Sequence, residues 1–399
     1  MAAKAPAPAE EPQRPKRDAK AVAEAQRKRE RTEWLIVALA PVAVMLLLGY
    51  LTYNEARGER LGFLAGIGWN PLAGVLLMVL IFALFSLGLN LQFGYTGLIN
   101  FGHVAFLGIG GYTSAILAWR FGPDFYTATL LETLGYTALI LLVSVAVATA
   151  FALLLGIPTL RLREDYLAIL TIGAAEIMRL VWLNEEEWTN GPNGLISRAP
   201  GSAWLFDEQD GWAAPFRALR ESSLAIDINP YAVFLILVAL AILALVFLFL
   251  ERLARSPWGR VVKAIREDED VAAALGKNVF VYKLQSLVIG ALIASIAGIL
   301  YAWFQRRIDP EYFQPILTFY AWIILVLGGV GNNKGVIVGS FILWGLFESA
   351  RYLPRMEAIG LTDPQGPAQV VFIGVLLIAI MMFRPQGVLG RKEDMLYGK

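Results

Sequence analysis

Long runs of apolar residues constrain the fold of this 399-residue chain more than any other feature. The hydrophobic residue types make up 57% of the sequence and the charged types only 17%, whereas about 25% of residues are charged in ordinary globular proteins. A soluble chain of this composition could not cover its surface with polar groups. We therefore expect an all-α, polytopic membrane helical bundle, and we exclude a soluble enzyme, a nucleic-acid binder and a disordered scaffold as the main function classes.

Ten apolar stretches are long enough to cross or enter a hydrocarbon core of about 30 Å, because a helix rises about 1.5 Å per residue. The eighth and ninth have 16 residues each and are compatible with a broken, a tilted or a re-entrant pair. Five spans per half would turn the second half upside down, so we expect a 5+5 inverted repeat with the translocation path between the halves. The stretches are residues 34–50, 70–92, 98–120, 134–157, 165–183, 230–250, 284–305, 316–331, 335–350 and 368–384.

The distribution of Lys and Arg between the connecting segments predicts the orientation. Ten spans place both termini on one side of the membrane, and the segments on that side carry 23 Lys and Arg against 10 on the other. Cytoplasmic loops are enriched in these residues, so we expect both termini in the cytoplasm. The chain then divides into a basic polar cytoplasmic tail (1–33), a transmembrane domain (34–390) and a second cytoplasmic tail (391–399).

Two connecting segments are long enough to have functions of their own. Residues 251–283 are expected in the cytoplasm as one or two amphipathic helices at the membrane surface, with a helix start at Ser256-Pro257 and a C-terminal glycine at Gly276. Ala272 and Leu275 continue the apolar edge of this segment. Residues 184–229 are expected on the periplasmic side; their eight acidic residues and three tryptophans fit an interfacial lid or a docking surface for an extracytoplasmic partner. The tryptophans are Trp188, Trp204 and Trp212.

Residues for catalysis or metal binding are sparse. The chain has no Cys and one His, which excludes a disulfide framework, a zinc–thiolate site and a His-rich metal site. The segment Gly331-Asn-Asn-Lys-Gly335 lacks the ending of a phosphate-binding P-loop. We therefore expect no catalytic, cofactor-binding or metal-ligating residue here, and any ATP hydrolysis would occur on another chain. His103 is either a hydrogen-bonded packing residue or a proton relay.

Ionisable residues inside apolar spans are energetically expensive and point to structure or function. Glu176 and Arg179 are three residues apart in the fifth stretch, so they share a helix face and are expected to pair. The pair fits a structural ion pair facing the bundle, or a gate or lining of the translocation path. Glu348 near the outer end of the ninth stretch can reach interfacial water.

Glycine and asparagine cluster in two places. Glycine lets helices approach closely and permits broken helices whose backbone lines a polar cavity. The spacings Gly335–Gly339 and Gly290-Ala294-Gly298 predict close helix packing, whereas the cluster at 90–111 is also a candidate lining of the path. Together with the ionisable pair, the candidate path or gate residues are Asn90, Gly97, Asn100, Gly102, His103, Glu176, Arg179, Gly329 and Gly331.

Several strings in this chain, taken together and in this order, resemble the membrane permease subunit of branched-chain (hydrophobic) amino-acid ABC importers. The resemblance extends from about residue 76 to 390. The strings are Gly94-Tyr-Thr-Gly-Leu-Ile-Asn-Phe-Gly-His-Val-Ala-Phe, Leu160-Arg-Leu-Arg-Glu-Asp-Tyr-Leu-Ala-Ile, Asn190-Gly-Pro-Asn-Gly-Leu195, Arg255-Ser-Pro-Trp-Gly-Arg, Gly328-Gly-Val-Gly331 and Phe383-Arg-Pro-Gln-Gly387.

The resemblance implies an ATP-driven importer in a bacterial or archaeal inner membrane. Its partners would be a sister permease chain, two cytoplasmic ATP-binding subunits that bind ATP and Mg²⁺, and a periplasmic substrate-binding protein. ABC permeases carry a cytoplasmic loop of the pattern Glu-Ala-Ala, three residues, Gly; residues 270–276 match it with Asp for Glu and Val for the first Ala. The implied coupling residues are Ile265, Asp270, Ala272, Ala273, Leu275 and Gly276.

Two other functions remain open. A urea or short-amide permease on the same scaffold would need only neutral hydrogen-bonding groups along its path. An ion-coupled secondary transporter would want acidic residues within the membrane, for which Glu176 and Glu348 are the candidates, and would not need an amphipathic inward loop.

Overall fold

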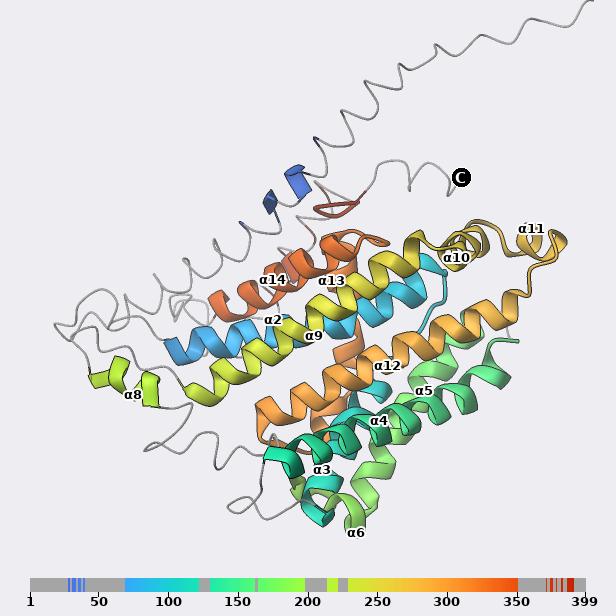
Figure 1. Cartoon of the computed structure of the whole chain (residues 1–399). Helices are drawn as coiled ribbons and strands as arrows, with labels where there is room; N and C mark the ends of the chain where they lie inside the picture. Colours follow the sequence, from blue (N-terminus) through green and yellow to red (C-terminus); the bar gives the residue numbers. More distant parts are fainter. Residues whose placement is uncertain are drawn as a thin grey trace, which may run out of the picture.

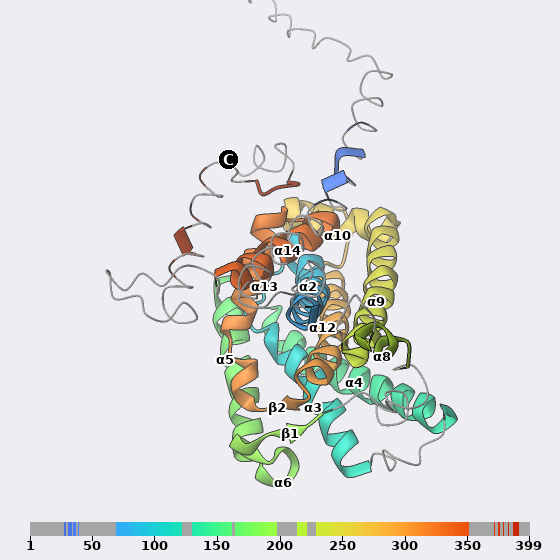
Figure 2. The same ribbon diagram turned by 90° about the vertical axis from the view of Figure 1, so that its left-hand side faces the viewer.

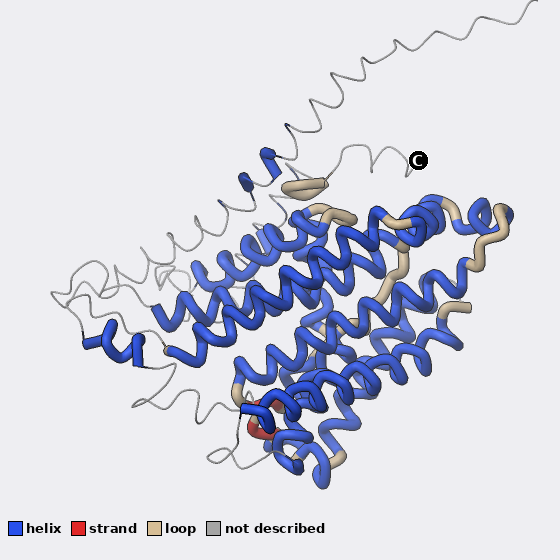
Figure 3. Tube along the Cα trace, viewed as in Figure 1, coloured by secondary structure: helices blue, strands red, loops and turns tan. Residues whose placement is uncertain are grey.

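Helices make up nearly all of the described chain (Figures 1 and 3). The computed structural model describes residues 69–121, 130–161, 164–197, 214–221 and 229–350, and parts of 28–39 and 371–390. The expected all-α class is confirmed for these residues. The elements are α2 (Trp69–Leu89), the π-helix η2 (Asn90–Tyr95), α3 (Val104–Phe121), α4 (Leu130–Thr159), α5 (Glu164–Asn184), α6 (Glu186–Thr189), η3 (Gly191–Asn193), β1 (Leu195–Ile196), α8 (Ala214–Glu221), α9 (Pro230–Arg255), α10 (Pro257–Glu267), α11 (Glu269–Ala274), α12 (Val279–Gln305), β2 (Arg307–Ile308), η4 (Pro310–Phe313), α13 (Ile316–Gly328) and α14 (Asn333–Ala350).

The centre of the bundle is formed by α2 and α12, with the other long helices around them (Figure 2). Most residues of α2 and α12 are buried, whereas α4, α5 and α9 are largely exposed. This difference follows from position, because all five helices are strongly apolar and only the central pair has neighbours on every side. The exposed apolar side chains of α4 and α9 fit contact with lipid.

The described residues contain six helices that are long and apolar enough to cross a membrane, or seven spans if α13 and α14 count as one. These two helices are bent by 116° at a short break, so the predicted eighth and ninth stretches form a bent pair. The first and tenth stretches, 34–50 and 368–384, lie largely outside the described residues. The ten-span count and the 5+5 inverted repeat therefore stay predictions.

Both glycine spacings are sites of close packing, as predicted. A Cβ atom at Gly290 of α12 would lie 2.7 Å from the carbonyl oxygen of Gly88 in α2. A Cβ atom at Gly335 or Gly339 of α14 would collide with the backbone of α13, at Gly328 or Ile324. The absence of side chains at these positions lets helix backbones touch, which is how small residues promote packing between apolar helices.

One stretch begins later than its hydropathy suggested. Residues 98–120 were expected to form a helix, but the chain leaves η2 at Tyr95 and becomes helical again only at Val104. Gly97 in this break has a φ of +77°, a conformation that side chains with a Cβ rarely adopt. The break separates α2–η2 from α3 and brings non-helical backbone to one end of the bundle.

The opposite end of the bundle carries the first part of the loop 184–229. There α6 and η3 lead into β1, which pairs antiparallel with β2, Leu195 opposite Ile308. Trp188 is exposed and the Arg120 guanidinium lies over its ring. Trp204 and Trp212 lie outside the described residues, and the lid and the docking surface both stay predictions. We call the two ends of the bundle the α10 end and the α6 end (Figure 1).

Candidate coupling site and translocation path

The predicted amphipathic segment forms two short helices, α10 and α11, at one end of the bundle (Figure 1). The Ser256 hydroxyl accepts a hydrogen bond from the Gly259 amide at the start of α10, and the Asp268 carboxylate accepts one from the Val271 amide at the start of α11. These caps satisfy amide groups that have no partner within the helix. The predicted helix start at Ser256-Pro257 is confirmed.

The residues implied in coupling divide into buried and exposed groups. Ile265 and Ala272 are buried and fix α10 and α11 to the bundle, whereas Asp270, Ala273 and Gly276 are exposed. Leu275 is 74% exposed, so the prediction that it shares an edge with Ala272 is wrong. The reason is that α11 ends at Ala274, and Leu275 belongs to the turn that follows.

Gly276 ends α11 as a C-terminal glycine, as predicted. Its φ is +77°, and its amide donates to the Ala273 carbonyl at 2.9 Å. The next residue, Lys277, donates to the Ala272 carbonyl at 3.2 Å. These bonds satisfy carbonyls at the helix end and leave the tip of α11 projecting from the bundle.

Arg266 of α10 reaches the point where the break between η2 and α3 lies next to the break between α13 and α14. Its guanidinium donates from Nη1 to the carbonyl oxygen of Gly94. A Cβ atom at Gly331 would lie 3.1 Å from the same Nη1, and a Cβ at Gly97 would lie 3.5 Å from the Arg266 Cγ. Glycine at these positions therefore leaves room for the arginine side chain between the breaks.

An amide pair holds the two breaks together. The Asn90 side chain donates from Nδ2 to Asn333 Oδ1 at 3.0 Å, and its Oδ1 accepts from the Gly331 amide at 2.9 Å. Asn333 Nδ2 donates in turn to Glu251 at the end of α9, at 3.3 Å. We call residues 90–97 and 328–333, which this network joins, the crossing.

A third segment, residues 386–390, packs on the crossing. The Val388 amide donates to the Leu327 carbonyl at 2.8 Å, and the Leu389 amide donates to the Gly328 carbonyl at 2.9 Å. Gly329, a predicted path residue, has a φ of +113° and lies against Gly390. Strings far apart in the sequence thus converge at the α10 end.

The other polar residues of the first cluster bond to each other inside the bundle. Asn100 donates to Gln92 Oε1 at 2.9 Å and accepts from the Gly102 amide at 2.9 Å, while Gln92 donates to the Leu287 carbonyl at 3.1 Å. His103 is fully buried, with Nε2 3.1 Å from the Phe85 carbonyl oxygen. The hydrogen bond fits the packing interpretation of His103, whereas a lining role for these residues stays a prediction.

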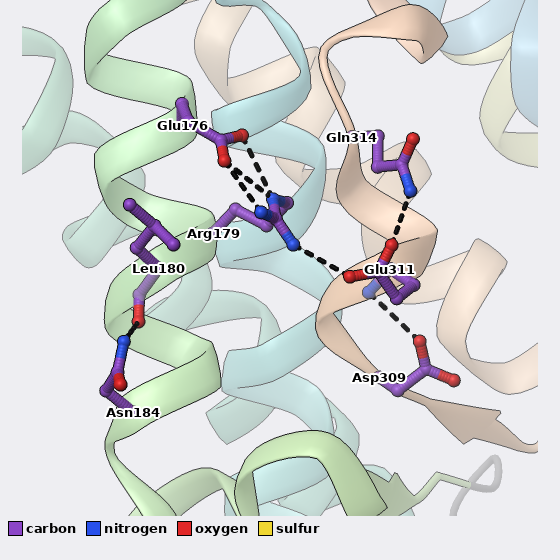
Figure 4. Close-up of polar contacts among 7 residues, drawn as sticks. All are labelled: Glu176, Arg179, Leu180, Asn184, Asp309, Glu311 and Gln314. Atoms are coloured by element: carbon purple, nitrogen blue, oxygen red, sulfur yellow. Dashed lines mark hydrogen bonds and ion pairs between the residues drawn. The ribbon is translucent and has the colours of Figure 1, made fainter.

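Glu176 and Arg179 of α5 form an ion pair near the α6 end (Figure 4). Arg179 donates from Nε to both carboxylate oxygens, at 3.1 and 2.9 Å, and from Nη2 at 2.7 Å. Its third nitrogen, Nη1, donates to Glu311 of η4 at 2.8 Å. The remaining oxygen of Glu311 accepts from the side chain of Gln314. The side chain of Glu348 lies outside the described residues.

Sequence reasoning missed three members of these sites. Asn333 and Glu311 lie 243 and 132 residues from the partners they bond, and no local pattern marks them. Arg266 was predicted only as part of the charged face of α10. Its apolar neighbours Val262 and Ile265 offered a signal, because they fix which side of α10 faces the bundle. Among the described residues, no group of three or more His, Cys, Asp or Glu side chains could hold a metal ion.

Comparison with known proteins adds the family context. A family model described as "Branched-chain amino acid transport system / permease component" matches residues 72–381. The chain is 34% identical over 317 residues to the high-affinity branched-chain amino acid transport system permease protein LivM of Escherichia coli (strain K12), covering 78% of this chain and 68% of that protein. It is 30% identical over 343 residues to the probable branched-chain amino acid transport permease protein LivM of Methanocaldococcus jannaschii, covering 80% and 93%. No solved structure matches significantly.

Proposed function

We propose, from the premise that this chain belongs to the family of branched-chain amino acid transport system permease components, that it is the membrane permease of an ATP-driven importer for branched-chain and other hydrophobic amino acids. Members of this family are components of transporters, not enzymes. ATP would be bound and hydrolysed by partner subunits, and this chain would provide part of the route across the membrane.

The observation that carries the proposal is the continuous connection from α10 to the crossing. Val262 and Ile265 fix α10 to the bundle, and Arg266 extends from the same helix to the Gly94 carbonyl. A force on α10–α11 would therefore act directly on the backbone breaks joined by Asn90 and Asn333. Breaks in helices are places where a bundle can change between two packed arrangements.

The proposed assembly has two ATP-binding subunits, a sister permease chain and a periplasmic substrate-binding protein. It would lie in the inner membrane of a bacterium or archaeon, with both termini of this chain in the cytoplasm. The exposed tip of α11, with Val271 and Leu275, would contact an ATP-binding subunit, because exposed apolar side chains outside the lipid zone mark interaction surfaces. The excess of Lys and Arg on this side supports the orientation.

A transport experiment with Arg266 tests the coupling. The complex is reconstituted in vesicles with its ATP-binding subunits and binding protein, and leucine uptake and ATP hydrolysis are measured together. We expect R266A to assemble and hydrolyse ATP while uptake falls about tenfold or more, because it loses a hydrogen bond from a charged donor. The control is R217A on α8, an exposed arginine at the other end of the bundle.

Two results would contradict the proposal. Uphill uptake by wild type without any ATP-binding subunit would remove the need for a partner motor. Normal uptake by R266A would show that coupling does not pass through the crossing.

A further inference from the structure

A charged cluster lies on the outer surface of the bundle, on a helix apolar enough to cross a membrane. Glu176 and Arg179 belong to α5, and Glu311 belongs to η4 beside it (Figure 4). The side chain of Glu176 is 39% exposed and that of Glu311 is 62% exposed. We call these three residues the charged cluster; two carboxylates and one guanidinium give it a formal charge of −1.

Lipid is a poor surrounding for such a cluster. Glu176 and Arg179 lie eight and five residues before the end of α5 at Asn184, which places them about 12 and 7.5 Å inside that end. Ionisable groups at this depth normally face the interior of a bundle or a water-filled cavity, because hydrocarbon cannot solvate them. The surface of α5 that carries the cluster is therefore expected to face water or polar protein.

Other exposed helices differ in this respect. Beyond its first turn, which carries the exposed Glu132, α4 exposes large apolar side chains, among them Leu134, Leu142 and Leu154. Before its last turn, which carries the exposed Arg255, α9 likewise exposes apolar side chains such as Leu245 and Leu248. Figure 2 shows α5 and α9 on opposite sides of the bundle. α5 exposes apolar side chains as well, such as Ile169 and Ile177, and what sets it apart is the charged cluster that it forms with η4.

A group of aromatic side chains lies next to α5, farther toward the α10 end of the bundle than the charged cluster. Phe101 stacks on Phe319 and Trp322 of α13, with ring centroids 5.5 and 5.0 Å apart. The Phe101 amide donates to Thr171 Oγ1 of α5 at 3.1 Å, which fixes this group between α5 and α13. Thr171 precedes Glu176 by five residues, or about 7.5 Å along the helix. Arg179, which bonds Glu311, lies three residues farther along, so charge and aromatic surface follow each other along one side of α5.

We propose that this side of α5 and η4 lines the aqueous substrate path, and that the charged cluster binds the ammonium group of an apolar α-amino acid. The inference rests on the proposed function, since it names the residues that meet the substrate. Glu311 is the contact for the ammonium group, because its carboxylate is the more exposed of the two. Arg179 positions Glu311, and Phe101, Phe319 and Trp322 accept the apolar side chain.

The absence of cysteine in this chain allows a direct accessibility test. Leu180 follows Glu176 by one helical turn and is 41% exposed, whereas Leu134 on α4 is 58% exposed. We expect a membrane-impermeant methanethiosulfonate reagent to label L180C in the reconstituted complex, because thiols react as thiolates in water. The control L134C, although more exposed, should remain unlabelled because it faces lipid. Q314C, next to Glu311, provides a second reporter if L180C does not fold.

Protection by ligands tests the binding step. We expect leucine to slow labelling of L180C, isopentylamine to slow it less, and 4-methylpentanoate, which lacks the ammonium group, to leave it unchanged. In the E311Q background the apparent affinity for leucine should fall about tenfold or more, because the partner of a charged hydrogen bond is removed. E221Q, which removes one carboxylate of the exposed Arg217–Glu221 pair on α8, is the matched control.

Each result decides the proposal. If neither L180C nor Q314C is labelled, this side of α5 and η4 faces lipid or protein and not water. If L180C is labelled but leucine does not slow the labelling, the path lacks this binding site. Uptake by L180C is measured in the same vesicles. If the L180C vesicles show ATP-dependent uptake together with either of these two labelling results, the inference is overturned and the proposed function remains intact.

Discussion

Gly88 and Gly290 face each other where α2 crosses α12, and a methyl group on Gly88 is expected to push the two central helices apart. A Cβ atom at Gly88 would lie 2.7 Å from the Gly290 carbonyl oxygen, and a Cβ at Gly290 would lie 2.7 Å from the Gly88 carbonyl oxygen. Ordinary contacts begin at 3.4 Å, so the backbones must separate by roughly 0.7 Å at this point. A gap of that size loses about a quarter to a half of the dispersion attraction between the atoms concerned.

The energetic cost of the added methyl group can be isolated by comparing G88A with a substitution at a second glycine that has free space around it. Gly135 of α4 has nothing within 4 Å of its added Cβ position. Replacing Gly by Ala within a helix gains up to about 1 kcal/mol of helix propensity in either variant. The difference in unfolding free energy between G88A and G135A therefore reports the crowding at Gly88, where the added methyl group meets the Gly290 carbonyl oxygen and, at 3.1 Å, the His103 ring; overpacking of this kind costs about 1–3 kcal/mol.

The assay is the apparent melting temperature of the purified complex in detergent, read from the folded fraction that remains after heating. Intrinsic fluorescence from the 11 tryptophans gives a second reading, and thiol-reactive dyes are unsuitable for a chain without Cys. We expect G88A to melt below G135A, and G135A to melt at or above wild type. The double variant G88A/G290A should cost less than the sum of its single variants, because the first methyl group already separates the helices.

Equal melting temperatures for G88A and G135A would refute the reasoning. They would mean that α2 and α12 do not depend on direct backbone contact. The effect of G290A is harder to interpret than that of G88A, because its Cβ would also collide with the side chain of Gln92.

Three further substitutions test other parts of the structure. N333A should lower stability by about 1–3 kcal/mol, because the buried amide of Asn90 loses its acceptor; an unchanged melting temperature would contradict this. W182A removes a ring that stacks on Tyr112 at 4.7 Å and should cost about 3–5 kcal/mol, with W182F less damaging in the same melting assay. L275D should leave the melting temperature unchanged, because this side chain is exposed, but should reduce co-purification of the ATP-binding subunits; full retention would exclude the α11 tip as their contact.

The close helix packing and the ion pair of α5 were predictable because their determinants are local. Glu176 and Arg179 are three residues apart, and a helix places such residues on one face whatever surrounds it. The end of α11 at Gly276 is local in the same sense, because a single residue with positive φ stops the helix. Helix boundaries next to the breaks were less predictable: residues 98–103 belong to a stretch that was predicted to be helical, but α3 begins only at Val104.

By itself, the sequence determined the class of the protein: long apolar runs require helices in a membrane, and the positions of glycines, caps and charges along each run specify its ends and close contacts. Tertiary structure alone decided which distant groups meet. Arg266 and Gly94 are 172 residues apart, Asn90 and Asn333 are 243 apart, and Arg179 and Glu311 are 132 apart. Periodicity shows which side of a helix a residue occupies, but the partner on that side depends on how the whole bundle packs. The groups that we expect to move and to bind substrate depend on the tertiary structure in this way, because each of them joins separate helices.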